Sequence, residues 1–178
     1  TRCISGTTFA NYILGIISAG IINCNIEAYS APKNADDSAQ TYYSQASTNA
    51  NKGDYDTAIE QMKKAIEQTN DENALFYTKL AGLYAEKGDW NNALAAYKKA
   101  AKIRPDDAFL YISIGNILQP LKDYDNAYAA YSQALQLIPE YKYNYLNLAN
   151  IEFIRKNYKS AIENYNLFLV LMSYLIML

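Results

Sequence analysis

Residues Gly88 to Pro105 read GDWNNALAAYKKAAKIRP, and this pattern returns along the chain at almost constant spacing. Aligned on one small residue, the copies centre on Ala58, Ala93, Ala127 and Ala161, which follow one another at steps of 35, 34 and 34 residues. The same neighbours return around each copy, including an aromatic residue three positions earlier (Tyr55, Trp90, Tyr124 and Tyr158). A period of this length indicates that one supersecondary unit is stacked several times.

Each unit has the residue pattern of two helices joined by a tight turn. In the second unit Tyr77, Leu80, Ala81 and Tyr84 are spaced i, i+3, i+4, i+7, which places them on one helical face. Gly88 then interrupts the pattern, as a left-handed residue at a helix end does. A second face follows, formed by Ala93, Tyr97 and Ala100. The small residues predict that the two helices cross closely.

Polar residues and prolines mark the helix ends. Asp89 is the expected N-cap of the second helix, and the equivalent positions hold Asp54, Asp123 and Asn157. Pro105 and Pro139 end their repeats because proline cannot continue a helix interior. Asp106 is then expected to cap the next helix.

Over residues 39–168 the chain resembles the tetratricopeptide repeat family. The resemblance is strongest in the two middle repeats, at Tyr77, Leu80, Ala81, Tyr84, Ala93, Tyr97, Ala100 and Pro105, then Tyr111, Ile114, Gly115, Leu118, Ala127, Tyr131, Ala134 and Pro139. It implies an all-α, right-handed solenoid of antiparallel helix pairs, with repeats at about 39–73, 74–107, 108–141 and 142–175. It also implies a concave groove lined by the first helix of each repeat.

Some positions depart from the family pattern. Gln45 and Asn49 stand where Leu and Tyr are usual, and a polar outer face suits the first repeat of a solenoid. Pro120 is expected to shorten the first helix of the third repeat by about a turn. In the fourth repeat Glu152 replaces a large apolar residue and Phe168 replaces Ala.

Composition excludes several functions. The chain of 178 residues has no histidine, and its two cysteines, Cys3 and Cys24, are not spaced as a Cys-x-x-Cys motif. Neighbouring carboxylates at Asp36–Asp37 and Asp71–Glu72 suit a linker and a helix cap. The net charge of −2 argues against nucleic acid as the ligand. We therefore expect no enzyme activity, no catalytic residues, no cofactor and no metal site.

The first 30 residues have the layout of a bacterial secretory signal peptide. Arg2 precedes an uncharged, largely apolar run over residues 9–22, and small residues follow at Ala28, Ser30 and Ala31. An uncleaved membrane anchor, lipidation at Cys24 and an ordinary buried helix remain alternatives. Residues 31–38 read as a polar linker. We expect an exported protein, periplasmic or secreted, with a membrane tether at the N-terminus as an open alternative.

The last twelve residues, Leu167 to Leu178, carry no charge. A solenoid normally ends on a polar outer face, because an open end exposes core. Three interpretations remain open: a chain whose continuation is missing, an end that docks on a partner or on a second copy, and contact with a membrane.

The groove implied by the resemblance is the candidate binding site for a protein or peptide. Two interpretations stay open for its side chains: they hold an extended or helical peptide, or the apolar ones pack on neighbouring helices while the asparagines face water. The basic clamp of relatives that bind chaperone C-termini looks absent, since the matching positions Tyr43, Ser47, Lys79, Phe109 and Ser113 include one basic residue. A protein-binding scaffold or assembly factor is the favoured function, and a membrane-tethered structural subunit that self-associates through its hydrophobic ends is the alternative. The candidate groove residues are Tyr43, Thr78, Phe109, Ile112, Asn116, Tyr143, Asn147 and Asn150.

Overall fold

The computed structural model describes residues 35–70 and 72–174. The predicted signal segment 1–30 and the tail beyond Tyr174 lie outside these residues. The described part is helical and contains no strand. Its helices are α2 (Ala35–Asn51), α3 (Tyr55–Glu67), α4 (Ala74–Glu86), α5 (Trp90–Ile103), α6 (Ala108–Leu118), α7 (Tyr124–Leu137), α8 (Tyr143–Ile154) and α9 (Tyr158–Tyr174).

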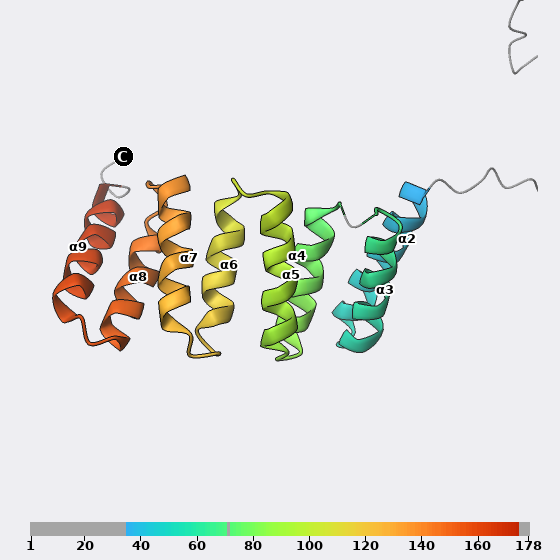
Figure 1. The fold of residues 1–178 in the computed structure, drawn as a ribbon, viewed down its shortest axis with the longest axis horizontal. Coiled ribbons are helices and arrows are strands. Elements are labelled where there is room, and N and C mark those ends of the chain that lie inside the picture. Colours follow the sequence, from blue (N-terminus) through green and yellow to red (C-terminus); the bar gives the residue numbers. More distant parts are fainter. Residues whose placement is uncertain (1–34, 71, 175–178) are drawn as a thin grey trace, which may run out of the picture. The chain divides into compact units, whose positions relative to one another are not determined.

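The helices form four consecutive pairs, α2–α3, α4–α5, α6–α7 and α8–α9, and each pair also packs on the next one. Figure 1 shows the pairs following one another in chain order. Small residues lie where the two helices of a pair cross: Ala58, Ala93 and Ala127 are fully buried, and Ala161 is nearly so. The close approach of the helices follows from these small side chains. The predicted all-α fold of repeated helix pairs is confirmed.

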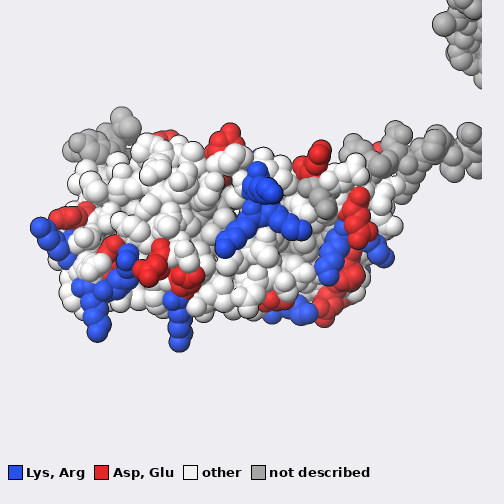
Figure 2. Space-filling model, in the orientation of Figure 1, with Lys and Arg blue, Asp and Glu red and all other residues white. Residues whose placement is uncertain are grey.

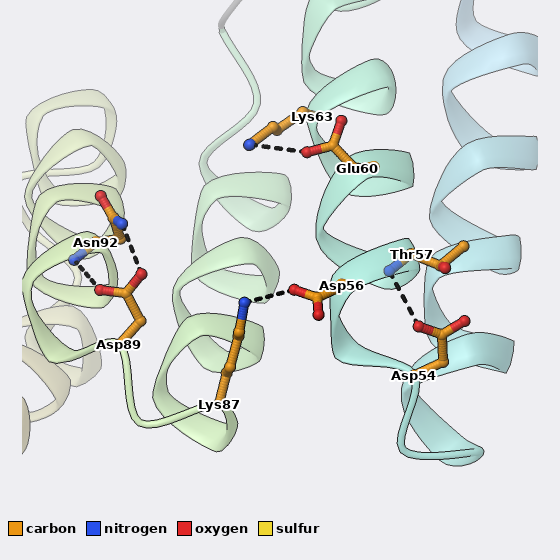
Figure 3. Close-up of polar contacts among 8 residues, drawn as sticks. All are labelled: Asp54, Asp56, Thr57, Glu60, Lys63, Lys87, Asp89 and Asn92. Atoms are coloured by element: carbon orange, nitrogen blue, oxygen red, sulfur yellow. Dashed lines mark hydrogen bonds and ion pairs between the residues drawn. The ribbon is translucent and has the colours of Figure 1, made fainter.

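The predicted turn chemistry recurs in the structure. The carboxylates of Asp54, Asp89 and Asp123 each accept a hydrogen bond from the backbone N–H three residues later, and Figure 3 shows the first two. The expected cap at Asp106 is wrong: Asp107 caps α6 and accepts from the N–H of Phe109. Asp107 directly precedes the first helical residue, which is the position from which a side chain reaches the free N–H groups.

Between the two helices of every repeat one residue has a positive φ. It is glycine in the first two repeats (Gly53 and Gly88) and lysine in the last two (Lys122 and Lys156). The four turns therefore share one backbone geometry although their residues differ.

The ion pair between Lys87 and Asp56 joins the end of α4 to the start of α3 (Figure 3).

Two helix bounds differ from the sequence expectation. α2 begins at Ala35, inside the predicted linker 31–38, where the acidic residues 36 and 37 suit the positive end of a helix dipole. α6 ends at Leu118 and has 11 residues against 13 in α4. Pro120 thus shortens it by two residues, less than the expected turn.

The contact between the third and fourth repeats buries polar side chains. Asn144 is fully buried and neither its Oδ1 nor its Nδ2 has a hydrogen-bond partner. Glu152 is 5% exposed; its Oε1 accepts from Arg155, and its Oε2 has no partner. Arg155 also pairs with Asp125 of α7 at 3.0 Å. The face of α8 that packs on α7 is therefore less apolar than the corresponding face of α4 or α6.

Candidate functional site

The candidate surface is formed by the first helices α2, α4, α6 and α8, and we call it the first-helix surface. Among the residues predicted from the sequence, Phe109, Asn116, Tyr143 and Asn150 are exposed there. The other four, Tyr43, Thr78, Ile112 and Asn147, are half-buried. Thr78 donates its hydroxyl to the carbonyl of Ala74 on its own helix. The exposed side chains gather in the C-terminal half of this surface.

A hollow of about 520 Å³ lies between α2 and α4 at the N-terminal half of this surface. Tyr43 lines one side, and its ring stacks on Phe76 with 5.4 Å between ring centroids. Leu75, which is 54% exposed, lines the other side. Tyr43 is thus held by Phe76 of the next repeat and lines an open space of mixed polar and apolar character.

An aromatic row crosses the C-terminal half of the first-helix surface. The ring of Phe109 contacts Tyr141 at 5.6 Å, Tyr141 contacts Tyr143 at 5.4 Å, and Tyr143 contacts Phe168 at 5.9 Å. The row joins the starts of α6 and α8 to α9. Phe109 is 58% exposed and Tyr143 is 45% exposed. Exposed rings held in place by neighbouring rings are well suited to anchor a partner, because little side-chain freedom is lost on binding.

The two predicted groove asparagines bond to tyrosines of their own repeats. The Tyr131 hydroxyl donates to Oδ1 of Asn116 at 2.7 Å, and the Tyr165 hydroxyl donates to Oδ1 of Asn150 at the same distance. Both bonds join the first helix of a repeat to its second helix. The sequence interpretations missed this role, although Asn and Tyr occur together at these two positions only in the third and fourth repeats.

Tyr131 is the most enclosed of these groups. Its side chain is fully buried, and its oxygen also accepts a hydrogen bond from Nε2 of Gln119 at 2.6 Å. Burial raises the pKa of Tyr131 to about 12, although the bond from Gln119 opposes this shift. The phenol therefore stays protonated and ties three residues of the third repeat together.

The opposite side of the repeats is formed by the second helices, and α5 gives it a basic area. Lysines 98, 99 and 102 are exposed on α5, and Lys99 lies over the ring of Tyr77 at 5.1 Å. Figure 2 shows basic side chains gathered near the middle of this face and a mostly uncharged area over the upper, C-terminal part of α7, which has no charged residue after Asp125. Within the described ranges no cluster of acidic, cysteine or histidine side chains is arranged to hold a metal ion. In the same ranges, no helix is both long and apolar enough to cross a bilayer.

Family comparisons agree with the repeat register. A model described as a tetratricopeptide repeat matches residues 39–72 and 110–141, and a second one, described as a TPR repeat, matches residues 81–122. The chain belongs to the tetratricopeptide repeat family. No curated protein sequence matches it significantly.

Solved structures share the fold of this tetratricopeptide repeat chain. A crystal structure of MamA is 18% identical with a TM-score of 0.73, and the alignment covers 99% of this chain and 100% of MamA. MamA from Desulfovibrio magneticus RS-1 is 17% identical with a TM-score of 0.71, covering 84% of this chain and 82% of that one. The first TPR domain of Spaghetti (RPAP3), solved with an HSP90 peptide, is 19% identical with a TM-score of 0.61, covering 68% and 95%. The repeats thus form the solenoid typical of the family.

Proposed function

We propose that this chain is a protein-interaction scaffold or assembly factor that holds a segment of a partner on the first-helix surface. The observation that carries the proposal is the aromatic row from Phe109 to Phe168, which exposes two fixed rings on the first helices that also carry Asn116 and Asn150. The RPAP3 domain binds its peptide on the same fold. Here the positions of the chaperone clamp hold a single basic residue, Lys79. The partner segment is therefore extended or helical, with aromatic or large apolar anchors in place of a terminal carboxylate.

Selection of random peptides displayed on phage against the full chain tests this proposal. We expect the selected peptides to be rich in aromatic and apolar residues and to lose at least about tenfold in affinity with Phe109→Ala plus Tyr143→Ala. Ile103→Ala is the matched control, because Ile103 is 38% exposed on α5, outside the first-helix surface. Equal peptide binding by the double variant and the control would contradict the proposal.

The second candidate is a structural subunit that self-associates through its hydrophobic ends, tethered to a membrane by its N-terminal segment. It is favoured by the exposed apolar side chains of α9, among them Ile162 and Leu169. With either function we propose that the protein is exported, because residues 1–30 have the layout of a signal peptide. Fractionation of cells that express the full chain tests this: recovery in the cytoplasm at full length would contradict export.

A further inference from the structure

A cleft of about 300 Å³ lies between α3 and α5, over α4, and we call it the second-helix cleft. Tyr77 and Leu80 of α4, both buried, form its floor. The hollow between α2 and α4 is lined instead by Leu75, Thr78 and Gly82 of the same helix. Helical spacing places these two sets of residues on opposite faces of α4. The second-helix cleft therefore opens away from the first-helix surface.

Small residues of α5 keep the second-helix cleft open. Ala95 and Ala96 line one side of it, and Ile66 and Glu67 of α3 line the other. Ala95 is exposed and Ala96 is buried, so neither side chain reaches across the space. A volume of about 300 Å³ is at the lower limit of ligand pockets. The cleft therefore suits one or two side chains of a partner better than a whole small molecule.

The two helices that border the cleft carry a surplus of positive charge. Their five lysines, all exposed, are residues 63, 64, 98, 99 and 102. α5 has no acidic residue, and α3 has Asp56, Glu60 and Glu67. Five lysines against three carboxylates give this border a net charge of +2, whereas the whole chain has −2. The cleft thus lies in a basic area of an acidic chain.

Two of these lysines line the cleft itself, from opposite sides. Nζ of Lys99 lies over the ring of Tyr77, 5.1 Å from its centroid, and this attraction holds the ammonium beside the floor. Lys63 donates to Glu60 at 3.0 Å (Figure 3), and this bond raises the pKa of Lys63, so that its ammonium stays charged. Because an ammonium has three N–H donors, both lysines can also bind a carboxylate.

We infer that the second-helix cleft binds an acidic segment of a partner protein. One large apolar side chain of the segment packs on the floor of the cleft, and carboxylates beside it accept hydrogen bonds from Lys63 and Lys99. The basic border attracts such a segment and orients it. Nucleic acid and anionic lipid fit less well, because their uniform negative charge would also approach Glu60 and Glu67. A peptide can place uncharged residues there.

The second-helix cleft shares no residue with the aromatic row. Its ligand is therefore additional to the segment that we place on the first-helix surface. A chain that binds one segment on each side can hold two partner proteins at the same time.

Fluorescence anisotropy of a labelled acidic peptide with one central phenylalanine, titrated with the full chain, tests the role of the lysines. We expect the affinity to fall at least about tenfold with Lys63→Gln plus Lys99→Gln, because hydrogen bonds between charged groups are the stronger ones. The matched control is Lys122→Gln plus Lys159→Gln, which removes the same charge at exposed positions outside α3 and α5. The control should bind the peptide like the wild type.

Filling the cleft tests the place of the apolar side chain and leaves every charge in position. Ala95→Phe should weaken binding of the acidic peptide at least about tenfold, because its ring would occupy the space of the anchor. The matched control is Ala129→Phe, at the equivalent exposed alanine of α7. A peptide with glycine in place of its phenylalanine should bind the wild type more weakly than the original peptide does.

Equal binding of the acidic peptide by the wild type and by both cleft variants, or no binding up to about 1 mM, would overturn the inference. So would tighter binding of phosphatidylserine vesicles or of a DNA duplex than of the peptide. Phe109→Ala plus Tyr143→Ala should leave binding of the acidic peptide unchanged, and a loss there would assign the peptide to the first-helix surface. Since the two sites use different residues, failure of the proposed function does not remove binding at the cleft.

Discussion

The ring of Tyr131 packs on Gly115 so closely that a Cβ atom at residue 115 would lie 2.6 Å from Cε1 of the ring. The equivalent first-helix positions of the other repeats hold Ala46, Ala81 and Ala149. The missing methyl group lets Tyr131 become fully buried. There its hydroxyl reaches Asn116 and Gln119.

Gly115→Ala should therefore destabilise the chain, although alanine is the better helix former. The clash with a buried ring costs about 1–3 kcal/mol, against a gain of up to about 1 kcal/mol in helix propensity. Urea unfolding measures the change. Gly82→Ala is the matched control: Gly82 also lies inside a first helix, and nothing lies within 4 Å of an added Cβ, so this variant should be stabilised by up to about 1 kcal/mol. Stabilisation by Gly115→Ala would mean that Tyr131 can move away.

Much of the fold can be predicted from the sequence, because the same residue pattern occurs in four copies and each copy supports the interpretation of the others. The position of each helix pair and the small crossing residues are set by local rules that four copies repeat. The left-handed turn is marked by glycine in the first two repeats only, because lysine holds the same position in the last two. The roles of Asn116 and Asn150 were missed because they depend on tyrosines 15 residues later on a different helix. A side chain assigned to a groove by helical spacing can still turn toward its own repeat. The aromatic row was likewise only partly predicted, since Tyr141 lies in a loop between repeats.

The pH dependence of stability should report on Tyr131. Its pKa rises from 10.0 to about 12 on folding, so the folded chain holds the phenol proton more tightly than the unfolded chain. The stabilisation is complete below pH 10 and is lost as the pH rises through about 12. The loss is about 2–3 kcal/mol.

Burial also raises the pKa of Tyr97, so the wild type alone does not isolate this contribution. The free energy of unfolding of the wild type minus that of Tyr131→Phe, measured by urea between pH 9 and pH 12, does. We expect this difference to shrink above pH 10. A difference that stays constant to pH 12 would show that Tyr131 ionises like an exposed tyrosine.

Lys156, which follows α8 with a left-handed backbone conformation, should be replaceable by glycine with a gain in stability. Lys156 has a φ of 65°, at the position that is glycine in the first two repeats. A residue with a side chain pays about 1–2 kcal/mol in this conformation, and glycine avoids that cost. Lys156→Gly should raise the urea midpoint by the equivalent of about 1 kcal/mol.

Lys98→Gly serves as the control for Lys156→Gly, because Lys98 is exposed within α5 and glycine there should cost about 1 kcal/mol. Opposite signs for the two lysine-to-glycine changes are the expected result. A loss of stability in both would mean that the side chain of Lys156 contributes more than its backbone conformation costs.

Replacing the buried amide of Asn144 should strengthen the contact between the third and fourth repeats. Neither polar atom of this fully buried side chain has a hydrogen-bond partner, and an unsatisfied buried polar group costs about 1–3 kcal/mol. The same position holds Phe76 and Leu110 in the second and third repeats, where both side chains are buried.

Asn144→Leu should therefore stabilise the chain by about 1–3 kcal/mol, with slower amide hydrogen exchange in α8 and α9 than in the wild type. Asn91→Leu, at an exposed position of α5, should change stability by less than about 0.5 kcal/mol. Because a repeat array gains stability from each interface between neighbours, the exchange should slow most in the fourth repeat. A loss of stability would indicate that the amide of Asn144 is hydrogen-bonded in solution. A uniform slowing over all repeats would indicate that the chain opens as one unit and not repeat by repeat.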